Sequence, residues 1–167
     1  MKANEVTIGE LFEVAIAAER VAGELYHRLA EKFSHKREVA DFWSKYAAEE
    51  AGHAKWLEQL RDRLSTEKLS APADPIKMQE ARTALEFSAE HRLRGVQNLE
   101  EAYQLVNELE NSEMNMVFEF LIDNFSADER TQVFLRSQLR EHLARLAVEF
   151  PIKFGGRAWR QEIKILE

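Results

Sequence analysis

Helix-breaking residues are rare in this chain, and their scarcity restricts its fold more than any other feature. The 167 residues include six glycines and three prolines, and the prolines are Pro72, Pro75 and Pro151. Between these breakers, apolar residues recur at the three- and four-residue spacing of amphipathic helices. The sequence therefore predicts an all-α chain with long helices over residues 7–33, 34–64, 79–111 and 126–150.

The connections between these helices follow from local signals. Thr7 with Glu10 and the segment 126–129 have the pattern of helix-starting capping boxes, and Pro151 is expected to stop the last helix at Phe150. Residues 65–78 are long enough to return the chain along a bundle. We expect one bundle domain over residues 1–150 and a tail over 151–167 that packs on the bundle or on a partner.

Composition excludes several classes of function. The formal net charge is −7, and both signs are interspersed along the chain, so nucleic acid and anionic membrane surfaces are not expected partners. The chain has no cysteine, and any metal must therefore be bound by carboxylate and imidazole groups. No apolar signal core or membrane-spanning stretch is evident, and a soluble cytoplasmic protein is expected.

Few polar side chains fall on the apolar faces when each helix is projected at about 100° per residue. The predicted core-facing polar residues are Glu19, Glu50, His53, Arg92 and His142. Burying so many ionisable groups costs several kcal/mol each unless they pair with one another or bind a metal. Because these residues lie at matching depths of neighbouring helices, the sequence predicts a shared polar centre.

Glu50 and His53 are separated by three residues, a spacing that lets one metal ion bind both side chains. With Glu19 in the preceding helix, this pattern resembles the ferritin-like superfamily and its rubrerythrin-like branch. The resemblance rests on residues 11–19, which lead to Glu19, and on residues 47–57, which contain Glu50-Ala-Gly-His53. It implies a ferritin-like antiparallel four-helix bundle in which two helical hairpins each give one Glu and one Glu-x-x-His to a di-iron site.

The second hairpin departs from this pattern. Residues 84–92 repeat the lead-in of the first helix, and the ligand position is then Arg92. In the last helix, His142 is retained and Leu139 stands where the carboxylate is expected. By this reasoning two of the four family carboxylates are missing.

Two functional hypotheses stay open from the sequence. In the first, Glu19, Glu50, His53 and His142 bind iron, manganese or zinc, as one ion per chain, with Tyr46 and Glu49 in supporting contacts. Any enzymatic activity would then be of a ferroxidase or peroxidase type, in iron metabolism or oxidative stress. In the second, no metal binds, and Glu19, Glu50 and Arg92 form a structural ion-pair network in a scaffold or partner-binding protein.

A short apolar helix is predicted over residues 114–125, between the third and fourth long helices. It has two apolar faces, one of which carries Met116 and Phe120. This segment either plugs the end of the bundle or meets another subunit through Met116 and Phe120, in a homodimer or larger homo-oligomer.

Overall fold

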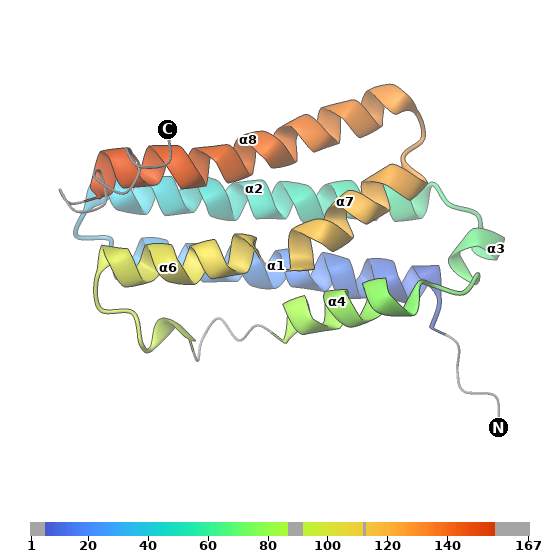
Figure 1. The fold of residues 1–167 in the computed structure, drawn as a ribbon, viewed down its shortest axis with the longest axis horizontal. Coiled ribbons are helices and arrows are strands. Elements are labelled where there is room, and N and C mark those ends of the chain that lie inside the picture. The colour runs from blue at the N-terminus through green and yellow to red at the C-terminus, as the bar shows by residue number, and fades with distance from the viewer. Residues whose placement is uncertain (1–5, 87–91, 112, 156–167) are drawn as a thin grey trace.

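Four long helical segments form an antiparallel bundle in the computed structural model, which describes residues 6–86, 92–111 and 113–155. Helices α1 (Ile8–Lys32) and α2 (Arg37–Asp62) form a hairpin, α6 (Leu99–Glu110) and α7 (Glu113–Phe125) follow one another along the bundle, and α8 (Glu129–Phe154) returns. In Figure 1, α1 and α8 run from right to left, whereas α2, α6 and α7 run from left to right. The predicted all-α bundle is confirmed.

Polar side chains cap α1 and α8 at the points where the chain enters them. The predicted cap of α1 is confirmed, because the Glu10 amide donates to the Thr7 side chain and the Thr7 amide donates to the Glu10 carboxylate. Helix α8 begins differently from the prediction. Its cap is Asp128, whose carboxylate accepts from the Thr131 amide at 2.8 Å, so the capping residue is not Ser126.

The third helix of the bundle is not the predicted helix over residues 79–111. Helices α3 (Thr66–Leu69) and α4 (Pro75–Leu85) lie in the connection that leaves α2, and α4 packs along α1 (Figure 1). A turn follows at Arg94 and Gly95, and Asn98 then caps α6 by accepting from the Glu101 amide. The connection to the third bundle helix therefore extends to residue 98, and α6 and α7 together make that helix.

The short helix over residues 114–125 exists as α7, but it lies along the bundle rather than over its end (Figure 1). Its residues Val117, Phe118, Leu121 and Ile122 are buried in the core. Phe120 faces α4, where the Lys77 ammonium is 5.9 Å from the ring centroid, and Met116 is 52% exposed.

Helix α8 continues past Pro151 to Phe154, so the predicted end at Phe150 is wrong. Proline removes one hydrogen-bond donor from the helix. The rings of Phe150 and Phe154 nevertheless pack on Phe42, with centroids 5.2 and 5.7 Å away, which favours another turn of helix. The rest of the predicted tail, residues 156–167, lies outside the described residues.

Two hydrophobic clusters fill the bundle, one on each side of a layer of polar residues. One cluster contains the fully buried rings of Tyr26, Trp43 and Phe150. The other contains Phe12 and Phe118 together with buried aliphatic side chains. Among the described residues, no helix is both long and apolar enough to cross a membrane.

Candidate metal centre

Five ionisable side chains make up the polar layer between the two clusters. Each has 8% or less of its surface exposed, and together they come from four helices: Glu19 of α1, Glu50 and His53 of α2, Glu110 of α6 and His142 of α8. Four of the five were predicted from the sequence, and Glu110 was not. The i, i+3 spacing on α2 places Glu50 and His53 on the same helix face, as predicted.

Glu19, Glu50 and His53 form the first of two triads. His53 Nδ1 lies 2.9 Å from Glu50 Oε2 and 3.6 Å from Glu19 Oε2. One nitrogen or oxygen atom of each residue lies within 4.8 Å of those of the other two, so one cation could bind all three.

Glu50, Glu110 and His142 form the second triad. His142 Nε2 lies 3.0 Å from Glu50 Oε1 and 3.3 Å from Glu110 Oε1. Glu50 therefore belongs to both triads, with Oε2 directed to His53 and Oε1 to His142. A carboxylate that faces two ligand sets through its two oxygens has the arrangement that a bridge between two cations requires.

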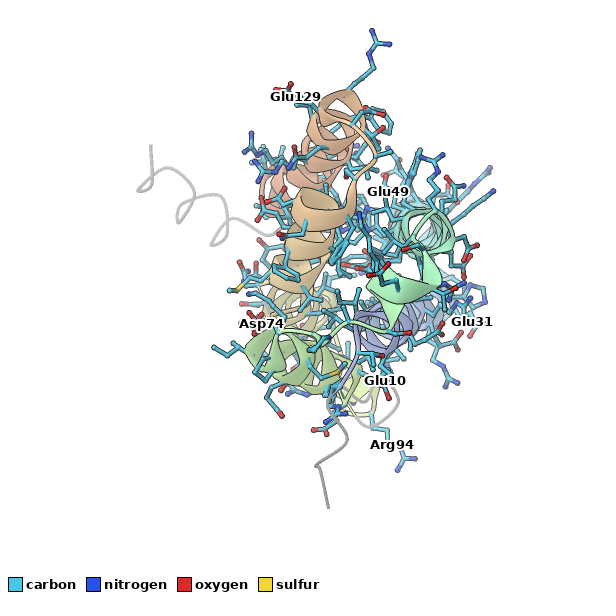
Figure 2. All side chains as sticks on the ribbon, turned by 90° about the vertical axis from the view of Figure 1, so that its right-hand side faces the viewer. Glu10, Glu31, Glu49, Asp74, Arg94 and Glu129 are labelled. Carbon is cyan, nitrogen blue, oxygen red and sulfur yellow. The ribbon has the colours of Figure 1, made fainter. Side chains whose placement is uncertain are left out.

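A second set of side chains orients these five. The other nitrogen of the His142 ring, Nδ1, lies 2.8 Å from Glu49 Oε2, and Arg145 pairs with the same carboxylate. The Tyr46 hydroxyl donates to the His142 backbone oxygen at 2.9 Å. Figure 2, a view along the bundle, labels Glu49 on the side of α2 that faces α8. Glu49 and Tyr46, the two residues predicted to support the site, thus both contact His142, and the Glu49 contact holds the imidazole with Nε2 inward.

Tyr26 supports the layer from α1, a role that sequence reasoning missed. Its hydroxyl donates to Glu110 Oε1, and its ring packs against Tyr46 with a centroid separation of 5.2 Å. Burial, together with the nearby negative charge of Glu110, raises the pKa of the Tyr26 hydroxyl well above its ordinary value. Tyr26 therefore stays protonated and fixes the orientation of the Glu110 carboxylate.

Burial and pairing shift the pKa values in the layer in opposite directions. Burial raises the pKa of Glu19 to about 8, and the neighbouring Glu50 charge adds to this shift. Burial alone would raise the pKa of Glu50 too, but the facing His142 and His53 outweigh it and hold that pKa well below its ordinary value. Glu50 is therefore the ionised member of the pair.

The two histidines behave as internal cations. Burial would lower their pKa values, but the facing carboxylates outweigh it and raise the pKa of His53 to about 10 and that of His142 to about 12. At neutral pH both imidazoles are therefore positively charged in the metal-free layer, with a proton on each ring nitrogen. A metal ion bound at either triad would have to replace the proton on the nitrogen that faces it.

Three buried atoms of the layer have no hydrogen-bond partner of acceptable geometry in the described part of the chain. They are Glu19 Oε2, Glu50 Oε1 and His142 Nε2. Buried polar atoms without a partner are rare in proteins and call for a physical explanation. All three face the interior of the two triads, and oxygen and imidazole nitrogen are the donors that iron, manganese and zinc accept, so the residues present fit a metal.

The position predicted for Arg92 is wrong. Its side chain is 49% exposed and pairs with the exposed Glu108 at 2.7 Å, so it does not face the core. The error arises because a turn at Arg94 and Gly95 separates Arg92 from α6, whereas the prediction extends one continuous helix through both. The hypothesis of a Glu19, Glu50 and Arg92 ion-pair network is therefore contradicted.

Glu110 supplies the carboxylate that Arg92 was thought to have displaced. It lies one helical turn after the buried Val106 and two turns after the buried Ala102, which places it on the apolar face of α6. This four-residue spacing is visible in the sequence and indicates that Glu110 is buried. Leu139, three residues before His142, is 5% exposed and packs in the apolar cluster of Phe12. The layer thus has three of the four carboxylates of the family pattern.

An antiparallel four-helix bundle with two carboxylate–histidine triads in its core, each of which could hold a metal ion, has the architecture of the ferritin-like proteins. The family model described as Rubrerythrin matches residues 10–142. The chain belongs to the rubrerythrin family. No curated protein and no solved structure matches it.

Proposed function

We propose that this protein binds up to two divalent metal ions in the polar layer, and that iron is the metal, as in the rubrerythrin family. The observation that carries the proposal is the position of Glu50, which directs one oxygen into each triad. Glu19 and His53 would complete the first set of ligands, and Glu110 and His142 the second. A cytoplasmic location and self-association through Met116 and Phe120 stay predictions.

The surrounding residues support this function by orientation and by exclusion of water. Glu49 accepts from His142 Nδ1, which leaves Nε2 as the nitrogen that faces the layer, and Tyr26 fixes Glu110. The two hydrophobic clusters enclose the layer on both sides. Bound iron would supply one-electron redox chemistry with dioxygen or peroxide, the activity class of a ferroxidase or peroxidase.

The test is metal stoichiometry. Protein purified without an affinity metal is loaded with Fe²⁺ under anaerobic conditions, freed of excess iron by gel filtration, and analysed for metal. We expect more than one ion per chain, and a large loss with Glu50→Gln, because both triads use that residue. Glu108→Gln is the matched control, since Glu108 is an exposed glutamate that pairs with Arg92. Less than about a tenth of an ion per chain in the unmodified protein would refute the proposal.

A second candidate function is a metal-free scaffold in which the two imidazolium groups balance the buried carboxylates. It is favoured by the close His53–Glu50 and His142–Glu49 pairs, which neutralise charge without an ion. The two candidates differ in the response to metal. A scaffold would show the same thermal unfolding with Fe²⁺ and with a chelator, whereas a ligand that binds only the folded state must raise the unfolding temperature.

A further inference from the structure

A cavity of about 160 Å³ lies between α2 and α8 and reaches both histidines of the polar layer. His53 and His142 border it on the inside, and Gly52, Trp56, Leu135 and Gln138 are among its walls. A cavity of about 150 Å³ holds one six-membered ring, while pockets for larger organic ligands measure about 300–1,000 Å³. The volume therefore suits a molecule of a few heavy atoms.

Gly52 keeps this cavity open. It lies in the middle of α2, where glycine makes a helix less stable than alanine does. A Cβ atom added at Gly52 would meet no atom within 4 Å, so close packing does not require a glycine there. Its φ is not positive either. The remaining effect of the missing side chain is space in the cavity beside His53.

The polar layer is one negative charge short when two divalent ions are bound. Two such ions carry four positive charges, and Glu19, Glu50 and Glu110 supply three negative ones. Glu49 is balanced by its pairing with Arg145. The fourth carboxylate of the family pattern is replaced by Leu139, and an unbalanced buried charge is strongly unfavourable.

The cavity borders the part of α8 where the fourth carboxylate is absent. Leu135, Gln138 and His142 of the cavity wall lie on both sides of Leu139 along the helix. Arg145 and its ion-pair partner Glu49 also border the cavity, and their opposite charges balance each other, so the attraction for an anion comes from the bound metal ions. Resting on the metal function proposed above, we propose that the cavity binds a small anion, of the size of formate or azide, that replaces the carboxylate absent at Leu139 and completes the two-ion site.

The first experiment measures the effect of anions on the second metal ion. Metal-free protein is titrated with Co²⁺, followed by visible absorption, in carboxylate-free buffer with formate, benzoate or perchlorate at equal ionic strength. We expect formate to tighten binding of the second Co²⁺ by about tenfold or more, within the usual range of coupling between sites. Benzoate is expected to match perchlorate, because its ring and carboxylate together exceed the cavity.

Variants assign the effect to the cavity. Leu139→Glu supplies the carboxylate within the chain and should abolish the formate effect, whereas Leu139→Gln, similar in size but uncharged, should retain it. Gly52→Leu should abolish the effect by filling the cavity and leave the first Co²⁺ in place. Ala51→Leu is its matched control, because Ala51 is exposed on the same helix. A formate effect that persists in a folded Gly52→Leu variant would overturn the proposal.

A metal-free readout tests the cavity independently. The chain has no cysteine, so Gly52→Cys and Ala51→Cys each introduce a single thiol. We expect methyl methanethiosulfonate to label both variants, and a maleimide on a polyethylene glycol chain to label Ala51→Cys only. Equal labelling of both by the bulky reagent, or no labelling of Gly52→Cys by the small one, would contradict the proposal. No Co²⁺ uptake with any anion would refute the metal function itself, whereas two-ion uptake indifferent to formate would refute the anion site alone.

Discussion

The metal-free protein should lose stability steeply as the pH rises from 7 to 9. The pKa values of His53 and His142 are about 10 and about 12 in the folded state and about 6.5 in the unfolded chain. A group with a raised folded-state pKa contributes stability that is complete below the unfolded pKa and is lost as the pH rises through the folded one. Between pH 7 and 9 the folded state therefore keeps nearly two protons that the unfolded state has released.

Each such proton changes the free energy of unfolding by about 1.4 kcal/mol per pH unit, so the two histidines together account for about 5 kcal/mol over this range. Glu19 acts in the same direction below pH 8, because its folded-state pKa, about 8, is also raised. A loss of this size is comparable with the whole stability of many domains. The chelator-treated protein should therefore be close to unfolding at pH 9.

Urea unfolding followed by circular dichroism at pH 6, 7, 8 and 9, with chelator present, measures this slope. His142→Gln should roughly halve it, because one of the two retained protons is removed. His27→Gln is the control, since His27 lies on the surface of α1 with its side chain 62% exposed. A free energy of unfolding that changes by less than about 1 kcal/mol from pH 7 to 9 would refute the assignment of the histidines as buried cations.

Three further predictions follow from the same layer. Affinity for the first divalent ion should rise by up to about a hundredfold per pH unit between pH 6 and 8, because Glu19 and His53 must both lose a proton. Competition with a chelator measures this affinity, and an affinity that does not change with pH would contradict the prediction. Elemental analysis should show about one metal ion per chain fewer in Glu110→Gln and an unchanged number in Arg92→Glu. Equal losses in the two variants would contradict the exposed position of Arg92. Gly52→Ala should raise the free energy of unfolding by about 0.5–1 kcal/mol in urea titrations, and a loss of stability would show that the glycine is required for packing.

The parts of the fold and site that the sequence predicts well are those set by local periodicity. Helices α1 and α2 end within a few residues of their predicted limits, and the i, i+3 spacing of Glu50 and His53 survives any small error in those limits. Glu19 and His142 each lie inside a long apolar stripe. Their burial therefore follows from the helix period alone.

The third helix of the bundle could not be predicted in this way, because α4 and α6 are segments of similar length that each bury one face. Which of them enters the bundle is decided by long-range packing, and periodicity within one segment does not contain that information. Gly95 and Asn98 mark the break between them, although each signal is weak alone. Once the break was missed, the wrong residue, Arg92, was assigned to the site and Glu110 was overlooked.

Glu110 is the last residue of α6, and this position has an electrostatic consequence. The aligned peptide dipoles of a helix place about half a negative charge at its end, so an ionised carboxylate there is repelled by the helix that carries it. The Asn115 amide, which donates to the Glu110 backbone oxygen and carboxylate, offsets part of this repulsion. A cation beside Glu110, whether the His142 imidazolium or a metal ion, relieves this repulsion. The charge state of the layer is therefore coupled to the point where the third bundle helix divides into α6 and α7. Removing the cation should loosen that junction before it affects either of the hydrophobic clusters.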